Sequence, residues 1–181
     1  MTKRKPKLFQ QTELLNYAVR ALGGRAHSTG ELREKLRRRA ERAEDVDVVL
    51  SKLKEIGYLD DRRFAESYAA SRLENQGLGK MRVLRDLRQR RIAPQLAEQA
   101  TEKTYQDTDE GALVEEFLKK KYRGKKLEEF LREEKNLAAA YRRLRYAGFA
   151  AGASIRVLKR FTRQAEELEA LEVEEAEEPE V

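Results

Sequence analysis

The fold is decided by one stretch of the chain, residues 28–65, which reads STGELREKLRRRAERAEDVDVVLSKLKEIGYLDDRRFA. Ser28 stands three residues before Glu31, which is the spacing of a capping box, in which two side chains satisfy free backbone N–H groups at a helix start. Leucines follow at helical spacing, and a second helical pattern ends at Gly57, a residue suited to a left-handed helix end. The stretch therefore predicts two helices and the start of a third, capped by Asp60.

Apolar residues recur at helical spacing on both sides of this stretch. Upstream, the pattern predicts a helix over about residues 12–22, which Gly23 and Gly24 should stop. The helix inside the stretch is expected to run from about Asp45 and to turn Ile56 inward. Downstream, Pro94 is suited to the first position of a helix, because its missing N–H has no partner there in any case.

The helical pattern restarts twice more towards the C-terminus. A further helix is expected near Asp107, with Glu110 closing another capping box. A short helix is expected inside an inserted segment at residues 123–136, and a last helix from about Ala153 that includes Phe161 and Ala165. The whole chain is therefore predicted to be all-α.

The helical pattern is also a repeat. The helices follow one another in groups of three, and we aligned the second helix of each group. Two sets of apolar positions then match: Leu32, Val83 and Ala140, and Leu36, Leu87 and Leu144. The offset is 51 residues and then 57, the excess falling in the inserted segment. Such a period indicates tandem units that bury their apolar faces against their neighbours. We expect three three-helix repeats that form an elongated, curved array.

The pattern gives the following boundaries: a basic N-terminal segment at residues 1–10, repeat 1 at 11–58, repeat 2 at 59–106, repeat 3 at 107–165 with its insertion near 123–136, and an acidic tail at 166–181.

Composition excludes several functional classes. Cysteine is absent and histidine occurs once, so no thiolate metal site, disulfide or histidine-based catalytic triad is expected. No apolar run approaches the roughly 20 residues of a membrane span. The sequence therefore predicts a cytoplasmic protein without membrane contact, cofactor, metal or enzymatic activity.

Charge is distributed unevenly along the chain. Forty per cent of the residues are charged and the formal net charge is +6, but residues 166–180 contain nine glutamates and no Lys or Arg. The rest of the chain therefore carries +15. A body this basic attracts polyanions or acidic protein surfaces, and the tail is expected to shield it or to keep it soluble.

The basic residues concentrate on the second helix of the first two repeats. Because the apolar stripes of these helices are narrow, the guanidinium groups cannot all point inward, and Arg is suited to bidentate contacts with phosphates and carboxylates. A solvated face balanced by nearby glutamates is the plainer alternative for any single arginine. The candidate binding residues are Arg33, Arg37, Arg38, Arg82, Arg85, Arg88, Arg90 and Arg145.

Other polar groups have simple structural interpretations. Asp60 and Asp61 lack further carboxylates or a histidine nearby, so a metal site is not expected there. His27 precedes the Ser28 cap and is expected at the surface. Helical spacing places the aromatic residues of this region in the core, not on a base-stacking platform: Tyr58, Phe64 and Tyr68.

Two motifs at a fixed distance resemble the RecX family. They are S-x-x-E-L-x-x-K-L at residues 28–36 and G-Y-L-D-D-x-x-F-A at residues 57–65, and the resemblance extends over about residues 15–163. It implies tandem three-helix repeats and, as partner, the filament that RecA recombinase forms on DNA. RecX-like proteins bind in the filament groove and inhibit its ATPase, strand-exchange and coprotease functions, and many also bind DNA. The resemblance therefore implies a regulator of RecA that also binds DNA. We expect a monomer with weak, sequence-independent affinity for single- and double-stranded DNA.

Two other functions fit the same residues. A helical transcription regulator would read a DNA sequence with one basic helix in the major groove, although few Asn or Gln side chains accompany the arginines. An adaptor would bind acidic proteins without DNA. A defined operator sequence would indicate the first alternative, and failure to bind RecA would indicate the second.

Overall fold

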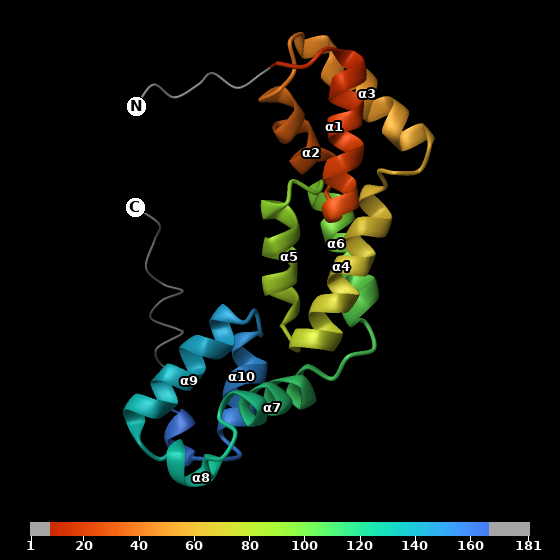
Figure 1. Ribbon diagram of the computed structural model, residues 1–181. Coiled ribbons are helices and arrows are strands. Elements are labelled where there is room, and N and C mark those ends of the chain that lie inside the picture. The colour runs from red at the N-terminus through yellow and green to blue at the C-terminus, as the bar shows by residue number, and fades with distance from the viewer. Residues whose placement is uncertain (1–7, 167–181) are drawn as a thin grey trace, which may run out of the picture. The chain divides into compact units, whose positions relative to one another are not determined.

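The structure, a computed structural model, describes residues 8–166 and is helical almost throughout (Figure 1). The helices are α1 (Gln11–Gly24), α2 (Thr29–Arg37), α3 (Ala43–Glu55), α4 (Asp61–Gln76), α5 (Lys80–Gln89), α6 (Pro94–Tyr105), α7 (Glu110–Lys121), α8 (Leu127–Phe130), α9 (Glu134–Tyr146), α10 (Ala151–Leu158) and a 3-10 turn at Arg163–Glu166. The all-α prediction is confirmed. Most of the predicted acidic tail, and residues 1–7 of the basic N-terminal segment, lie outside the described residues.

The chain divides into two compact units. The first comprises Met1–Tyr68 with Asp86–Ala100, and the second comprises Ala69–Arg85 with Thr101–Val181. Both units therefore take residues from the second predicted repeat, and the repeat boundaries stay a prediction.

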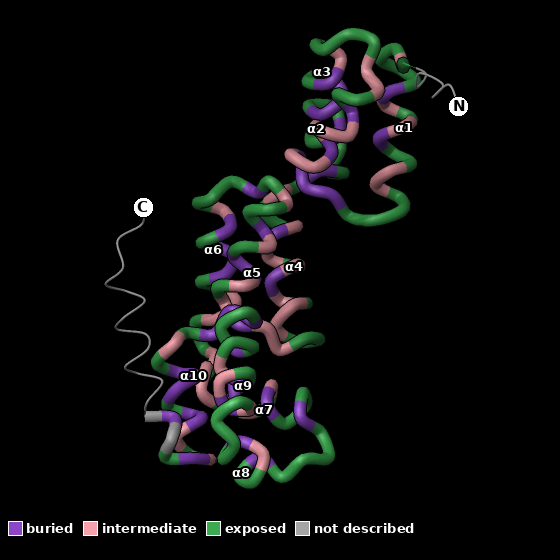
Figure 2. Tube along the Cα trace, turned by 90° about the vertical axis from the view of Figure 1, so that its left-hand side faces the viewer, coloured by how far each residue is buried: buried purple, intermediate pink, exposed green. Residues whose placement is uncertain are grey.

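Helices α1, α2 and α3 enclose the core of the first unit, whose buried residues are marked in Figure 2. That core consists of Leu14, Ala18, Leu32, Leu36, Val46, Val49, Leu50, Leu53 and Leu59. The capping box is confirmed, because the Glu31 N–H donates to Ser28 Oγ at 3.0 Å and the Ser28 N–H donates to Glu31 Oε2 at 3.1 Å. These two bonds fix where α2 begins.

The end of α3 is also as predicted. Gly57 has a φ of +75°, and the N–H groups of Tyr58 and Leu59 both donate to the Leu53 carbonyl. This left-handed ending satisfies a carbonyl that the last helical turn leaves free. It leads directly to Asp60, whose side chain accepts from the Arg63 N–H at 2.9 Å and caps α4 as expected.

The first helix ends at the glycine pair as predicted, because α1 extends to Gly24, although neither glycine adopts a positive φ. Predictions for the apolar residues that follow α3 are wrong. Ile56 is exposed, since the chain leaves the helix at that residue and turns at the next. The aromatic residues assigned to the core are not fully buried: Tyr58 is exposed, and Phe64 and Tyr68 are half-buried.

The second unit has a core of its own, to which α7, α8, α9 and α10 contribute. Among its residues are Val114, Leu118, Leu127, Leu131, Leu137, Ala140, Leu144, Phe149, Val157 and Leu158. The short helix predicted in the insertion is α8.

The six aligned apolar positions of the repeat are buried as predicted. None of them has exposed surface: Leu32, Val83, Ala140, Leu36, Leu87 and Leu144.

Two helix ends of the second unit differ from prediction. The cap of α7 is Asp109 and not Asp107, since Asp109 accepts from the N–H groups of the first turn, and Glu110 instead accepts from the Ala150 N–H at 2.8 Å. Helix α10 ends at Leu158, so Phe161 lies beyond it in a turn. Across residues 8–166, the helices are too short or too polar to cross a bilayer.

Candidate binding surfaces

Three predicted arginines lie in or directly after α2, and Arg33 is half-buried whereas the other two are exposed. Arg37 is exposed and has no ion-pair partner in the described part of the chain. Arg38 Nη2 lies 3.4 Å from Glu34 Oε1, and Arg33 pairs with Asp47 across to α3. Such surface pairs are weak, about 0–1 kcal/mol, so Arg33 and Arg38 can exchange these partners for an external anion at little cost.

Arg88 occupies the corresponding place on α5. Its side chain is exposed, and Nη2 lies 2.9 Å from Glu98 Oε1. Arg88 follows the buried anchor Leu87 as Arg37 follows Leu36. The repeat thus presents an exposed arginine twice at equivalent positions of the first unit.

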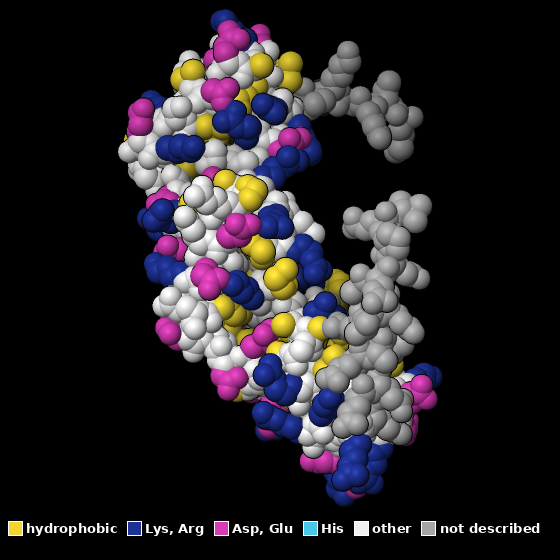
Figure 3. Space-filling view, turned by 180° about the vertical axis from the view of Figure 1, so that it is seen from behind, with side chains coloured by type: hydrophobic (Ala, Val, Ile, Leu, Met, Phe, Trp, Pro, Cys, Tyr) yellow, Lys and Arg dark blue, Asp and Glu magenta, His cyan; other side chains and the backbone are white. Residues whose placement is uncertain are grey.

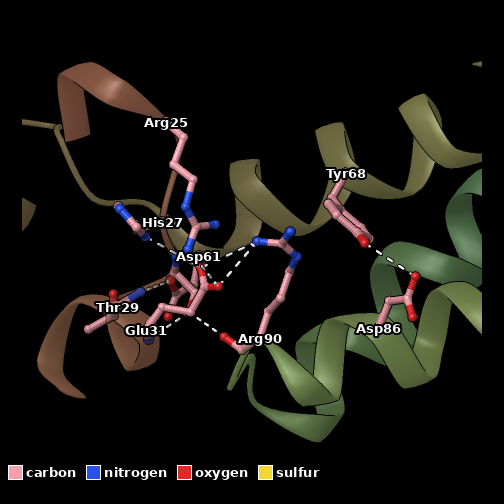
Figure 4. A network of polar contacts seen from close by, with 9 residues as sticks. Arg25, His27, Thr29, Glu31, Asp61, Tyr68, Asp86 and Arg90 are labelled. Carbon is pink, nitrogen blue, oxygen red and sulfur yellow. Dashed lines mark hydrogen bonds and ion pairs between the residues drawn. The ribbon is translucent and has the colours of Figure 1, made fainter. Parts of the chain in front are cut away.

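Unlike the exposed Arg37 and Arg88, Arg90 makes its contacts within the protein, as Figure 4 shows. Its side chain is only 27% exposed, and Nη1 lies 3.2 Å and 3.5 Å from the two carboxylate oxygens of Glu31. The guanidinium also lies 4.8 Å from the centre of the Tyr68 ring, and the Tyr68 hydroxyl donates to Asp86 Oδ2 at 3.3 Å. Arg90 therefore links the start of α2 to α4 and α5.

Backbone groups complete this junction. Ser28 Oγ donates to the Arg90 carbonyl, and the Thr29 N–H donates to Asp61 Oδ1 at 2.7 Å. Gly30 lies so close to Arg91 that a Cβ atom on it would be 2.8 Å from the Arg91 carbonyl oxygen. Asp60 and Asp61 are thus both engaged at helix starts. Within residues 8–166, no three metal-ligating side chains gather.

The prediction that His27 lies at the surface is wrong. Only 6% of the residue is exposed, because the loop before Ser28 packs against the junction. Burial lowers the pKa of His27, and the nearby Arg25 lowers it further, while Glu31 acts in the opposite direction. His27 Nδ1 has no hydrogen-bond partner and lies 3.8 Å from Glu31 Oε2. Its surroundings in the first unit therefore favour the neutral form of the single histidine over the charged one.

His27 forms part of the wall of a cleft with a volume of about 480 Å³. Its charged side chains are five cations and two carboxylates. The complete lining is Tyr17, Arg25, His27, Glu31, Glu34, Lys35, Arg38, Arg39 and Arg91. Of the cations, only Arg38 was predicted as a binding residue. We refer to this surface as the α1–α2 cleft.

The predicted arginines of the second unit have varied surroundings. The Arg82 guanidinium lies 4.7 Å from the centre of the exposed Tyr146 ring, and Arg145 Nη1 donates to the Phe149 carbonyl at 2.8 Å. Arg85 is exposed, with no ion pair to any described residue. Figure 3 shows that Lys and Arg side chains are interspersed with Asp and Glu on the face that it presents.

Comparison with known proteins identifies two regions of the chain. Residues 15–53 match the sequence model of the first three-helix domain of RecX, and residues 60–100 match that of the second. These matches include most of α1 and α3, all of α2, α4 and α5, and the residues at the junction between them.

Curated relatives carry the same name. The chain is 43% identical over 100 residues to "Regulatory protein RecX" of Deinococcus radiodurans, covering 53% of this chain and 46% of that protein. It is 31% identical over 132 residues to the Vibrio parahaemolyticus protein of that name, covering 73% of this chain and 81% of the relative. The match thus spans about half the length of some relatives and most of others.

Solved structures show the same fold. The crystal structure of RecX from Lactobacillus salivarius superimposes with a TM-score of 0.63 at 18% identity, covering 83% of this chain and 96% of that one. At this identity the likeness concerns the fold alone.

Proposed function

Because the chain belongs to the RecX family of regulatory proteins, we propose that it modulates the RecA recombinase, mainly as an inhibitor. It binds in the groove of the RecA–DNA filament and restrains ATP hydrolysis, strand exchange and coprotease activity. It acts in the cytoplasm as a monomer, without a cofactor, and it also binds single- and double-stranded DNA weakly and without sequence preference.

The observation that carries this proposal is the equivalence of Arg37 and Arg88. Each follows a fully buried leucine, so the fold fixes the direction of both side chains, and each is exposed. A repeated, exposed guanidinium suits a partner that is itself repetitive and acidic, as a filament of identical subunits on DNA is.

Other arginines extend the proposed contact set. Arg33, Arg38, Arg82, Arg85 and Arg145 belong to it. Arg90 supports the surface indirectly, because its guanidinium is already paired with Glu31 and packed over Tyr68. Its replacement should therefore act through the junction and not through a lost contact with the partner.

Contact with more than one RecA subunit explains how the protein would select filaments. If separate parts of the chain each bind one subunit weakly, the second contact forms at high effective concentration only where subunits are adjacent. A molecule in the groove would then hinder entry of a second duplex and the subunit motion coupled to ATP hydrolysis.

Co-sedimentation tests this proposal. The protein is mixed with RecA filaments assembled on single-stranded DNA, with free RecA, or with the same DNA alone, and each mixture is centrifuged. We expect far more protein with filaments than with either component. Equal recovery with DNA alone would indicate a DNA-binding protein, and recovery with neither RecA sample would exclude the proposed partner.

A charge-reversal pair locates the surface. Arg37→Glu with Arg88→Glu should weaken recovery with filaments while leaving helicity by circular dichroism intact. Lys52→Glu with Lys54→Glu is the matched control, because it changes net charge equally at exposed positions of α3 outside the proposed set. If both pairs behave alike, Arg37 and Arg88 are not in the contact surface.

A further inference from the structure

The cations of the α1–α2 cleft differ in how they are neutralised. Arg25 Nη2 lies 3.5 Å from Glu31, which also holds Arg90. Arg38 and Arg91 both approach Glu34, at 3.4 Å and 3.8 Å. Three of the five cations thus already share carboxylates of the cleft.

The other two cations, Lys35 and Arg39, have no carboxylate partner among residues 8–166. Both instead lie beside the same aromatic ring, because Lys35 Nζ and Arg39 Cζ are each 5.9 Å from the centre of Tyr17. Tyr17 in turn packs against Phe9, with ring centres 5.5 Å apart. An aromatic ring therefore holds two unneutralised positive charges at one wall of the cleft.

The backbone fixes the position of Arg39 independently of its side chain. The Phe9 N–H donates to the Arg39 carbonyl at 2.7 Å, and the Glu41 N–H donates to the Phe9 carbonyl at 2.9 Å. These bonds tie the turn after α2 to the segment before α1. The two cations therefore lie in a part of the unit whose backbone is held by these hydrogen bonds.

The lining of the cleft carries more positive than negative charge, since five cations face two carboxylates. Besides burial, the cations Arg25 and Lys35 lower the pKa of His27, although Glu31 raises it. The buried imidazole is one wall of the cleft and its Nδ1 has no hydrogen-bond partner. The site is thus polar, cationic and only partly satisfied, as an anion-binding site would be.

We infer that the α1–α2 cleft binds the phosphate backbone of a nucleic-acid strand, with Lys35 and Arg39 as the contacts that neutralise phosphates. This inference rests on one part of the proposed function, which is that the protein binds nucleic acid. Tyr17 is a positioning residue, because cations already lie beside its ring and it has little free face on which a base could stack. Binding is therefore independent of base sequence.

Phosphates suit the cleft better than the carboxylates of an acidic protein. Glu31 and Glu34 already supply carboxylates to Arg25, Arg38 and Arg91, so another carboxylate would only replace a like group. A nucleic-acid strand brings a row of charges and releases condensed counterions when they are neutralised, which gives it an added gain in free energy.

The test compares two double variants that remove the same charge. Lys35→Gln with Arg39→Gln alters the cleft, and Lys52→Gln with Lys54→Gln alters exposed positions of α3. Binding of a short fluorescein-labelled oligo-dT strand is measured by fluorescence anisotropy between about 50 and 200 mM salt. The cleft variant should bind more weakly, and its slope of log affinity against log salt should be shallower by about 1.4, because two phosphate contacts are lost.

The control variant should keep the wild-type slope. Equal slopes for both variants, with helicity unchanged, would overturn the inference. A second result would also overturn the inference: binding of a poly-glutamate peptide depends on Lys35 and Arg39, whereas binding of the oligonucleotide does not depend on them. Tyr17→Leu should weaken oligo-dT binding, whereas Tyr17→Phe should keep it, since only the ring is needed.

The same proteins distinguish this inference from the proposed function. If wild type co-sediments with RecA filaments and the cleft variant keeps the wild-type salt slope, the cleft assignment fails and the function stands. If the slope falls as expected but wild type ignores filaments, the cleft assignment stands and the function fails.

Discussion

Gly79 and Gly148 let two backbone segments of the second unit touch. The Gly79 N–H donates to the Ala147 carbonyl at 2.9 Å, and the Met81 N–H donates to the Gly148 carbonyl at 3.1 Å. A Cβ atom on Gly79 would lie 2.6 Å from the Phe149 nitrogen, which is backbone and cannot rotate away. Gly148 also has a φ of +92°, which other residues rarely adopt.

Gly79→Ala should therefore lower the free energy of unfolding by about 1–3 kcal/mol, the range for overpacking. Gly152→Ala is the control, because Gly152 lies in α10 with no other atom within 4 Å of its Cβ position. It should leave stability unchanged or raise it by up to about 1 kcal/mol, since Ala favours the helix. Urea unfolding measures both, and a Gly79→Ala protein as stable as wild type would contradict the described contact.

His27 predicts how stability depends on pH. Its pKa is lowered in the folded protein, chiefly by burial, so the unfolded chain binds a proton more readily. The stabilisation is fully present above the ordinary His pKa of about 6.5 and is lost as the pH falls through that value towards the folded pKa.

Urea unfolding at pH 7.5 and at pH 5.5 should thus show a loss of stability in wild type that is smaller in His27→Gln. The comparison isolates this residue because the chain has one histidine. An equal loss in both proteins would show that His27 is not buried as described.

Single residues could be predicted where a local rule determines them. The Ser28 cap and the Gly57 turn follow from sequence spacing alone. The burial of His27 depends on contacts between the start of α2 and residues about 60 positions away, such as the Ser28–Arg90 hydrogen bond. A local sequence pattern cannot predict such contacts.

The start of α2 is joined to the end of α5 by Glu31 and Arg90. The Glu31 carboxylate both completes the capping box with Ser28 and pairs with Arg90 Nη1, and the Glu31 and Arg90 side chains are mostly buried. One carboxylate therefore ties a helix end to a neighbouring helix.

A double-mutant cycle measures this tie. Glu31→Gln and Arg90→Gln, alone and together, should give a coupling energy of about 1–2 kcal/mol from urea unfolding. The same cycle on the exposed pair Arg88 and Glu98 should give only about 0.2–0.5 kcal/mol, because solvent screens it. Equal coupling in the two pairs would mean that the junction is no tighter than a surface ion pair.

Helix existence was easier to predict than helix ends. Asp107 and Asp109 both precede α7, and the sequence favoured Asp107 because Glu110 then completes a capping box. In the structure Glu110 accepts from Ala150 instead, so a tertiary contact overrides the local motif.

The distribution of charge along the whole chain is the property that the sequence predicts best. Residues 166–180 carry nine glutamates, and the remainder of the chain carries +15. We predict that these glutamates compete with nucleic acid for the basic body.

Deleting residues 166–181 should therefore raise affinity for oligo-dT at low salt, and the difference should shrink as salt screens the charges. A variant with all nine glutamates changed to glutamine should behave like the deletion. Unchanged affinity in both proteins, measured by anisotropy, would rule out the competition.

The repeat could be predicted because buried anchors leave a periodic apolar pattern, as Leu36, Leu87 and Leu144 show. The α1–α2 cleft could not, because its cations come from separate segments. Arg25 precedes α2, Lys35 lies within it, and Arg91 follows α5. Only folding brings them together.

Regulation of RecA by this chain can be measured through the ATPase activity of RecA on single-stranded DNA, titrated with the protein at substoichiometric ratios. We expect hydrolysis to slow well before one copy per RecA subunit is reached, because each bound molecule restrains several subunits. A rate that stays constant up to equimolar protein would contradict the proposed regulation.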